Sequence, residues 1–414
     1  MELSIDISVS TFDEIFGEIK VMKKILVYKW YSYNDLDIEY AFLQAGYEIT
    51  YVERTNLTYE KDEAFEDMIK KELETNSYSF FFTMNYFSAI SNICNAYGVK
   101  YVSWTCDNPL IAMYDESVFH ACNYIFAFDK SNYLEFKDRG VKHIYHLPLA
   151  VNTSRLSELL HDEKYAMKHK QFANDIAFVG SLYQKRSTYD KLKDSFPEFL
   201  NGYLDGMVQA RLLISTNDIL DEMMTPEILS MIEEQYHLEK TKDSFSDLGL
   251  IFQTTVLGFK IAQRQRTSAL LAIAKLFSLT VYHKEKDKEL LLAKEPGPVN
   301  YWLEMPFVFY NTKINLNFTI PNIKTGVPLR VFDVLGSKGF LITNAQPEIL
   351  EIFEDGIDLV CFYNQEDLLH KIDYYLTHSK ECEEIAAHGY ETVRRKHSYQ
   401  KRVRQIEEIL SKDE

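Results

Sequence analysis

Residues with the chemistry to hold a phosphate ester gather in one short stretch, NLNFTIPNIKTGVPLRVFDVLGSKGFLITN, residues 315–344. Its two apolar runs and the turn residues between them predict a strand, a loop, a short helix and a second strand. The polar candidates lie in the loop and at the start of the helix: Lys324, Thr325, Gly326, Arg330 and Asp333.

A helix that follows a parallel strand presents N–H groups and partial positive charge to ligands at the sheet edge. Lys324 and Arg330 would add full positive charges that suit a diphosphate. Asp333, one turn further on, could accept hydrogen bonds from a ribose diol. The unit is therefore predicted to bind a nucleoside diphosphate, with a solvated loop lysine and a plain helix-start carboxylate as the structural alternatives for Lys324 and Asp333.

A second group for the same ligand follows the strand in NDIAFVGSLYQKRS, residues 174–187, which predicts a strand, a glycine turn and the start of a helix that carries Lys185 and Arg186. A glycine after that strand would let the backbone approach a ligand closely, or would serve only as a turn. A histidine after the strand LTVY could contact the base or the diphosphate, with a satisfied core histidine as the alternative. These donor-side candidates are Gly180, Ser181, Lys185, Arg186 and His283.

The ends of earlier strands supply candidates for a second, acceptor substrate: Trp30, Tyr31, Asn85 and Asp107. Asp107, in YVSWTCDNP, could act as a catalytic base or hold acceptor hydroxyls. Capping the turn before Pro109 is the alternative role for Asp107. Tyr301 and Tyr310 could stack on a base, but a chain with 28 tyrosines favours core positions for both.

Strands and helices alternate through the first part of the chain, which predicts a doubly wound parallel sheet. The expected strands are residues 24–30, 47–53, 78–85, 99–109, 123–129 and 143–150. The expected helices are residues 34–46, 60–75, 87–98 and 130–140. We place this domain at residues 22–155 and treat residues 1–21 as an N-terminal appendage.

The pattern restarts at residue 174 and predicts a second doubly wound domain over residues 156–395. Its further strands are expected at residues 278–285, 305–321, 339–344 and 359–363. A largely helical stretch, about residues 190–270, is longer than an ordinary crossover and is predicted to be an insertion. Residues 396–414 are expected to form a final helix. The fold class is therefore α/β, with two Rossmann-like domains.

Composition excludes several classes of protein. The 414 residues carry a net charge of −17, which argues against tracking nucleic-acid phosphates because counterion release needs concentrated Lys and Arg. Five scattered cysteines with no CxxC pair favour reduced thiols in the cytoplasm and no structural zinc. We expect no transmembrane segment and no export signal. A basic cluster at residues 394–402 leaves peripheral membrane contact open, with a solvated helix face as the alternative.

Phosphate-binding motifs of other classes do not fit. No GxGxxG follows the first strand and no GxxxxGK[ST] occurs, so a dinucleotide enzyme and a P-loop NTPase are poorly supported.

Three C-terminal segments carry a pattern of a glycine, an Arg-x-Phe-acid core, a glycine, L-x-T-N and F-E-D-G. They read GVPLRVFDVLGSKGFLITN, PEILEIFEDGIDLVCFY and IAAHGYETVRRKHSYQKR. These segments resemble the CgeB-like, spore maturation branch of the GT-B glycosyltransferases. Upstream, YVSWTCDNP and YIFAFDKSNYLEFKDRGVKHIYHLPLAVNT resemble the domain that precedes them in that family. The resemblance covers about residues 22–155 and 174–405.

The resemblance implies the GT-B fold, in which two Rossmann-like domains face each other across a cleft and the last helix crosses back to the first domain. The second domain would bind a nucleotide-sugar donor and the first an acceptor. No metal or other cofactor would be required, because helix N-termini and basic residues neutralise the leaving diphosphate. The DLD string at residues 35–37 is the metal signature of the other glycosyltransferase fold, but its place at a helix start predicts capping.

Related family-4-type enzymes carry two acids eight positions apart in this loop and helix. The second acid matches Asp333, which implies the ribose role, whereas the first falls at Thr325, which is not acidic. Those enzymes also carry G-R-L…K where this chain reads GSLYQKR. Ser181 replaces the arginine, so Lys185 or Arg186 would have to neutralise the phosphate.

We therefore expect a glycosyltransferase that moves a sugar from a nucleotide-sugar, preferably a UDP-sugar, to a protein or glycan acceptor with retention of configuration. A non-catalytic sugar- or nucleotide-binding assembly protein is the alternative that Thr325 and Ser181 favour. A sugar-nucleotide epimerase is the third reading. The sugar, the acceptor and the oligomeric state stay open.

Overall fold

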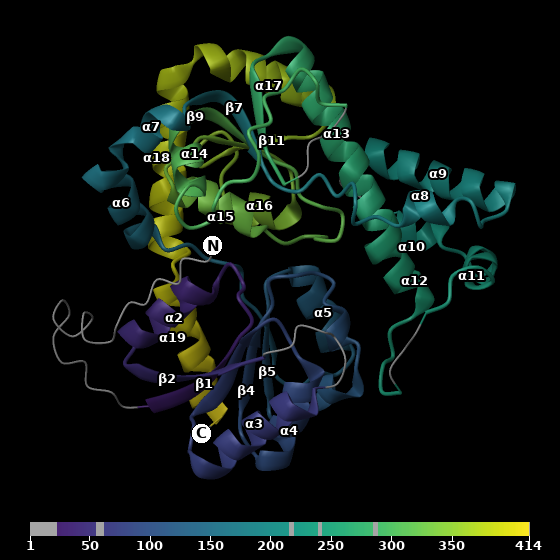
Figure 1. The fold of residues 1–414 in the computed structure, drawn as a ribbon, viewed down its shortest axis with the longest axis vertical. Helices are drawn as coiled ribbons and strands as arrows, with labels where there is room; N and C mark the ends of the chain where they lie inside the picture. The colour runs from purple at the N-terminus through teal and green to yellow at the C-terminus, as the bar shows by residue number, and fades with distance from the viewer. Residues whose placement is uncertain (1–22, 55–61, 215–218, 239–241, 285–288, 414) are drawn as a thin grey trace.

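Two parallel-sheet domains lie one above the other in the computed structural model, with a helical unit beside them (Figure 1). The structure describes residues 23–54, 62–214, 219–238, 242–284 and 289–413. The expected appendage, residues 1–21, lies outside these described residues.

The first domain contains a six-stranded parallel sheet with the order β2-β1-β3-β4-β5-β6. Its strands are β1 (Lys23–Lys29), β2 (Tyr47–Glu53), β3 (Phe80–Met84), β4 (Tyr101–Trp104), β5 (Asn123–Ala127) and β6 (Ile144–His146). Its helices are α2 (Asp35–Gln44), α3 (Glu63–Thr75), α4 (Ser88–Tyr97), η1 (Ile111–Met113), η2 (Glu116–Phe119) and α5 (Lys130–Asp138). Every residue of β3, β4 and β5 is buried, as expected for parallel strands covered on both faces.

The second domain contains a five-stranded parallel sheet with the order β11-β10-β9-β7-β8. Its strands are β7 (Asn174–Val179), β8 (Leu279–Tyr282), β9 (Thr312–Asn317), β10 (Leu341–Asn344) and β11 (Val360–Phe362). Its helices are α6 (Thr153–His161), η3 (Glu163–Tyr165), α7 (Ala166–Gln171), α14 (Met305–Asn311), α15 (Leu329–Gly336), α16 (Pro347–Ile352), α17 (Gln365–Thr377) and α18 (Ser379–Lys396). Both sheets reverse their winding once, between β1 and β3 and between β7 and β9, and ligands of such sheets bind at the carboxyl ends beside that switch point.

The helical insertion folds around its own apolar core, which includes Leu204, Met207 and Ile232. Its elements are α8 (Tyr189–Leu192), α9 (Glu198–Leu213), α10 (Leu220–Met223), α11 (Pro226–Glu233), α12 (Leu248–Ile251), the π-helix η4 (Phe252–Leu257) and α13 (Gly258–Leu276). Ser244 forms an antiparallel bridge with Asp115 of the first domain. The insertion therefore contacts the first domain as well as the domain from which it emerges.

Two expectations for the second domain were wrong. Residues 305–321 do not form one strand, because α14 occupies Met305–Asn311 and β9 begins only at Thr312. Pro306 lies in the first turn of α14, where its missing N–H has no helical partner to lose. The helix expected directly after Gly180 begins only at α8, so Lys185 and Arg186 lie in a turn instead.

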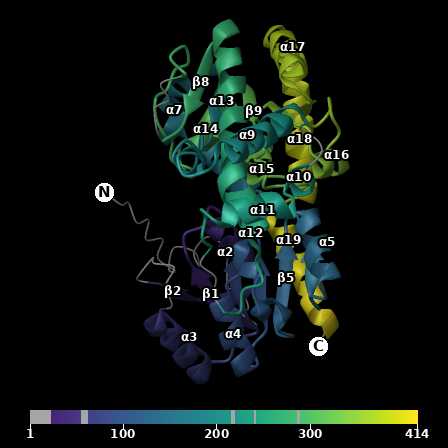
Figure 2. The ribbon, with the colours of Figure 1, turned by 90° about the vertical axis from the view of Figure 1, so that its right-hand side faces the viewer.

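The final helix, α19 (Tyr399–Leu410), followed by η5 (Ser411–Asp413), runs along the first domain and packs on α2 (Figure 2). The Tyr399 hydroxyl accepts a hydrogen bond of 3.0 Å from Asn34 Nδ2, and Tyr47 donates one of 2.9 Å to Glu407. This helix therefore links the end of the chain to the first domain.

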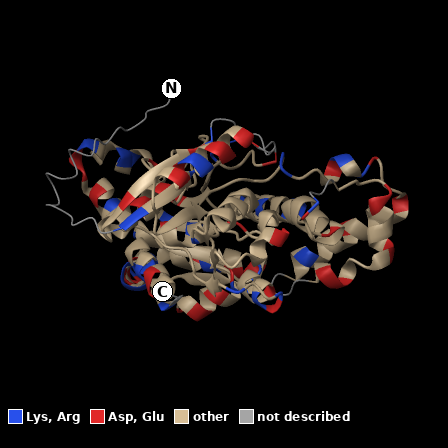
Figure 3. Cartoon of the chain, turned by 90° about the horizontal axis from the view of Figure 1, so that it is seen from below, with Lys and Arg blue, Asp and Glu red and all other residues tan. Residues whose placement is uncertain are grey.

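Charges of both signs are interspersed over the ribbon in the part of the chain that is described (Figure 3). Within the basic cluster 394–402, Arg394 and Arg395 pair with Glu391 at the surface, whereas Arg402 is buried. The cluster is therefore not a single exposed basic face. None of the described helices combines the length and apolar character needed to cross a bilayer.

Burial beside Arg402 gives His397, which lies between α18 and α19, an unusual protonation equilibrium. Arg402 donates a hydrogen bond of 2.6 Å to Nδ1 of His397, and burial together with this cation lowers the pKa of His397 to about 3. The folded protein therefore keeps this histidine neutral, whereas the unfolded chain protonates it near pH 6.5.

We predict that His397 makes the folded state less stable as the pH falls from 6.5 towards 3, because only the unfolded chain gains the proton in that window. His397→Asn, whose side-chain oxygen can still accept from Arg402, should remove about 2 kcal/mol of the stability change between pH 7 and pH 5. Urea unfolding at each pH measures it. The exposed His388→Asn is the control, and equal pH slopes for the two variants would contradict the assignment.

Candidate active site

A buried arginine bridges the two loops at the switch point of the second sheet. Gly180 and Ser181 follow β7, and Phe318 follows β9. Arg266, from the middle of α13, donates to the carbonyl oxygens of Ser181 at 2.6 Å and Phe318 at 2.5 Å. The insertion's last helix therefore delivers a cation to the place where parallel sheets bind their ligands.

The charge of Arg266 is not balanced within the described chain. Its side chain is 8% exposed, it has no ion pair with a described carboxylate, and its Nε has no hydrogen-bond partner there. Burial, with a smaller contribution from nearby Arg330, lowers the pKa of Arg266. Because buried charges are normally paired, two arginines beside one switch point suit an anionic ligand.

Arg330 and Asp333 lie together at the start of α15, as their spacing predicts. Arg330 Nη1 donates to Asp333 Oδ2 at 3.1 Å, and the hydroxyl of Tyr301 donates to Asp333 Oδ1 at 2.8 Å. Tyr301 also contacts the ring of Tyr33 in the first domain, with 4.7 Å between ring centroids. Two hydrogen-bond donors therefore hold Asp333 close to where the second domain contacts the first.

Burial sets the protonation of this cluster. It raises the pKa of Asp333, while Arg330 and the Tyr301 hydroxyl oppose that shift. Burial and the neighbouring Asp333 raise the pKa of Tyr301 well above its ordinary value. Tyr301 thus remains a hydrogen-bond donor to Asp333.

The loop that carries Lys324, Thr325 and Gly326 faces the first domain. Asp129, at the start of α5, accepts from the Lys324 amide at 2.9 Å, and its Oδ1 lies 2.6 Å from the Thr325 hydroxyl. A Cβ on Gly326 would lie 3.0 Å from the Asp129 Cα. Glycine is therefore required for this close approach, and the loop forms a contact across the cleft.

Glu348, at the start of α16, completes this contact. Its Oε1 lies 2.8 Å from the Thr325 hydroxyl and accepts from the Lys130 amide at 2.7 Å, while Oε2 lies 2.7 Å from Nε2 of His146. The interface between the domains is therefore rich in charge-assisted hydrogen bonds on this side.

The acceptor candidates gather at the switch point of the first sheet. Tyr31, after β1, and Asn85, after β3, both adopt positive φ angles of 64° and 62°. Such angles are uncommon for residues with a Cβ and concentrate at functional sites. Asn85 Nδ2 donates to Asp107 at 2.8 Å, and Trp30 donates to the Met84 carbonyl at 2.7 Å. Asp107 is exposed, so its carboxylate is accessible as well as oriented.

Three donor candidates have no hydrogen bond to these groups among the interactions described. His283 is buried against Glu295 beyond the edge strand β8. Lys185 and Arg186 are exposed in the turn before α8, with the Arg186 guanidinium 5.9 Å from the Tyr183 ring. Arg266, rather than either of these cations, is the one bonded to the Ser181 carbonyl.

The DLD string does not provide a side-chain cap for α2. Asp35 accepts from the Ser32 amide at 2.8 Å, and Asp37 forms an ion pair with Arg155, with Asp37 oxygens 2.8 Å from Nε and 2.9 Å from Nη2. The capping expectation was therefore wrong, because a long-range arginine and a local turn use these carboxylates instead. Among the described residues, no group of three or more His, Cys, Asp or Glu is arranged to hold a metal ion.

Sequence reasoning missed Arg266 and gave Tyr301 only a tentative role. Arg266 interrupts an otherwise apolar helical stripe that includes Ala262, Ala269 and Ile273, and this break in the stripe was the available signal. No local signal identifies Asp129, whose role depends on how the two domains meet.

Comparisons with known proteins agree with this architecture. Residues 265–408 match the protein family described as glycosyl transferase-like. No curated protein sequence matches the chain.

Solved structures resemble the chain over nearly its full length. The Anabaena protein HepE in complex with UDP and glucose is 8% identical with a TM-score of 0.54, covering 94% of this chain and 100% of that one. Sucrose-phosphate synthase from Thermosynechococcus elongatus is 9% identical with a TM-score of 0.55, covering 95% and 100%. A UDP-forming α,α-trehalose-phosphate synthase from Burkholderia xenovorans is 11% identical with a TM-score of 0.51, covering 94% and 98%. The expected GT-B fold is thereby confirmed.

We predict that Thr325→Val lowers the free energy of unfolding by about 1.5–3 kcal/mol, because it removes the hydroxyl shared by Asp129 and Glu348. Chemical denaturation measures the change. Thr377→Val is the matched control, since that exposed hydroxyl has only local partners, the Tyr374 carbonyl at 2.9 Å and Nδ1 of the adjacent His378 at 3.1 Å. Equal losses in the two variants would show that the interdomain contact contributes nothing specific.

Proposed function

We propose that this protein is a GT-B glycosyltransferase, of the CgeB-like branch, that transfers a sugar from a UDP-sugar to a protein or glycan acceptor. The observation that carries the proposal is the unbalanced buried charge of Arg266 beside Arg330 at the switch point. A diphosphate supplies the missing negative charge and bidentate acceptors for guanidinium groups. HepE, which shares the fold, is described in complex with UDP-glucose, and this supports the choice of nucleotide.

The donor would lie along the carboxyl ends of β7 and β9. Arg266, Arg330 and the N-terminus of α15 would hold the diphosphate, with Gly180 and Ser181 beside it. Asp333 would accept hydrogen bonds from the ribose diol once the sugar hydroxyls compete with Tyr301. Lys324, Thr325 and Gly326 would lie where the donor sugar meets the first domain.

Chemistry would proceed with retention and without a metal. The acceptor oxygen bonds to the anomeric carbon as the bond from that carbon to the diphosphate breaks, and the bonding pair leaves with the diphosphate. Arg266 and Arg330 stabilise the charge that develops there. The acceptor proton passes to a leaving phosphate oxygen, so no strong protein base is needed, and Asp107 would orient acceptor hydroxyls.

We place the reaction in the cytoplasm. All five cysteines are unpaired, and Cys94, Cys361 and Cys382 are buried, which suits a compartment that keeps thiols reduced.

A non-catalytic binding module is the second candidate function. Thr325 stands where related enzymes carry an acid, and its hydroxyl is engaged by Asp129 and Glu348 across the cleft. Release of free sugar from UDP-sugars by the purified protein separates the two: an enzyme of this type hydrolyses its donor slowly, whereas a module that only binds does not.

Arg330→Ala and Arg266→Gln should each weaken UDP binding by about 1.5–3 kcal/mol, which is roughly 10- to 150-fold in Kd, because each removes a charge-assisted contact. Isothermal titration with UDP measures the change. Arg394→Ala, an exposed arginine paired with Glu391, should bind like the unaltered protein. Unchanged UDP affinity in both cleft variants would rule out this diphosphate site.

The nucleotide can be identified with a panel of UDP-, GDP-, TDP- and CMP-sugars in thermal unfolding. At a hundredfold excess over its dissociation constant, the true donor should stabilise the protein by about 2.7 kcal/mol through mass action. We expect a UDP-sugar to give the largest shift. A larger shift with a GDP-, TDP- or CMP-sugar would overturn the choice of uridine.

A further inference from the structure

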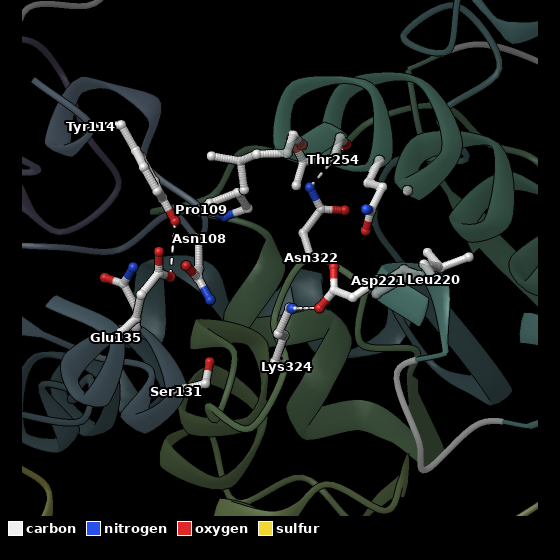
Figure 4. A pocket seen from close by; sticks show the side chains of 15 residues that line it. Asn108, Pro109, Tyr114, Ser131, Glu135, Leu220, Asp221, Thr254, Asn322 and Lys324 are labelled. Atoms are coloured by element: carbon white, nitrogen blue, oxygen red, sulfur yellow. Dashed lines mark hydrogen bonds and ion pairs between the residues drawn. The ribbon is translucent and has the colours of Figure 1, made fainter. Parts of the chain in front are cut away.

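A pocket with about 70 Å³ of free volume lies where the first domain, the loop after β9 and the helical insertion meet (Figure 4). The first domain contributes Asn108 and Asn132, the loop contributes Asn322, and the insertion contributes Gln253 and Thr254. Three separate parts of the chain thus converge on one cavity beside the proposed donor site.

Three carboxamides on the pocket wall are not satisfied by the described protein. Asn132 is only 4% exposed, yet its side chain has no hydrogen-bond partner among the described residues, and neither does that of Gln253. Asn322 donates to the Thr254 carbonyl at 3.1 Å, but its buried Oδ1 accepts no hydrogen bond from the described residues. The amides of Asn132 and Gln253 are therefore free to hydrogen-bond to a polar ligand that enters the pocket.

The charges on the wall do not favour an anionic ligand. The lining includes the carboxylate of Glu135, which pairs with Arg139 at 3.0 Å, and that of Asp221, which pairs with the ammonium group of Lys324 at 2.9 Å. Carboxamides present donors and acceptors together, as hydroxyl groups do. Leu250 and Pro109 add apolar surface of the kind that the C–H faces of a sugar ring contact. The lining therefore suits a neutral, polyhydroxylated group.

The π-helix η4 places the insertion's residues at this wall. Two threonine hydroxyls bond to backbone carbonyl groups in this wider helical turn. Thr254 donates to the Leu250 carbonyl at 2.7 Å, and Thr255 donates to the Ile251 carbonyl at 2.6 Å. Such helices are rare and occur often at functional sites. Directly after it, a Cβ on Gly258 would lie 2.5 Å from the Asn322 Oδ1, so glycine is needed to seat that amide.

We propose that this pocket binds the acceptor, that the acceptor group is an uncharged carbohydrate, and that the insertion determines its specificity through Gln253, Thr254 and Gly258. The assignment as acceptor rests on the proposed glycosyltransferase function, whereas the binding of a neutral sugar stands on the pocket itself. Sugar phosphates and phospholipid-linked headgroups are disfavoured by the two carboxylates.

Saturation-transfer NMR on the full chain without nucleotide tests the proposal. The probes are the methyl glycosides of glucose, galactose, mannose and N-acetylglucosamine, with glucose 6-phosphate as the anionic counterpart. We expect at least one neutral glycoside to bind in preference to the phosphate. Gly258→Ala and Gln253→Leu should each weaken that binding about tenfold or more.

Gly202→Ala on α9 is the matched control, because a Cβ there meets nothing within 4 Å. Because a Cβ on Gly258 forces the Asn322 amide to shift, Gly258→Ala should unfold at a lower temperature than the control, and Gln253→Leu is the variant that tests sugar binding without that clash. The proposal fails if no neutral glycoside binds, if both pocket variants bind like the control, or if glucose 6-phosphate binds better. UDP titration of the same samples is read separately, so absence of UDP binding would count against the glycosyltransferase and not against the sugar pocket.

Discussion

One buried guanidinium group connects the parts of this protein that matter for ligand binding. Arg266 holds the Ser181 and Phe318 carbonyls, and these belong to the loops on either side of the switch point in the second sheet. The same arginine is carried by α13, the last helix of the insertion. Because its charge has no described carboxylate beside it, the site is arranged around positive charge before any ligand arrives.

The two domains contact each other through different kinds of interaction on the two sides of the cleft. Near α5 and α16, Asp129 and Glu348 gather backbone amides and the Thr325 hydroxyl from both domains. Near α2 and α15, Tyr33 packs on Tyr301, which in turn holds Asp333. The residue proposed to bind the ribose is thus supported by an aromatic contact from the opposite domain, so donor binding would depend on how the two domains approach each other.

Much of this architecture was predictable because local pattern and fold agree. Buried parallel strands read as continuous apolar runs, and the turn residues between them mark the ends at which Arg330 and Asp333 lie. The pattern failed at Met305–Asn311, where an apolar run without a period fitted a strand as well as a helix.

Residues whose roles depend on tertiary contacts could not be identified from local sequence patterns. Arg266 lies far along the chain from Ser181, and only the folded insertion brings the two together. The hydrogen bond between Asp129 and Thr325 depends on how the two domains pack together, and a short stretch of sequence carries no information about that. Asp37 was expected to cap its helix, but its carboxylate instead forms an ion pair with Arg155, 118 positions away in the sequence.

The attachment of the insertion to both domains has a mechanical consequence. The Phe245 amide donates to the Tyr114 carbonyl, and the Glu116 amide donates to the Asp243 carbonyl, each at 2.9 Å. The insertion therefore spans the cleft and is bonded to the first domain. Rotation of one domain against the other on that side must break these two hydrogen bonds. Near α2, the ion pair between Asp37 and Arg155 resists the same movement, so the two sides of the interface are secured by different kinds of contact.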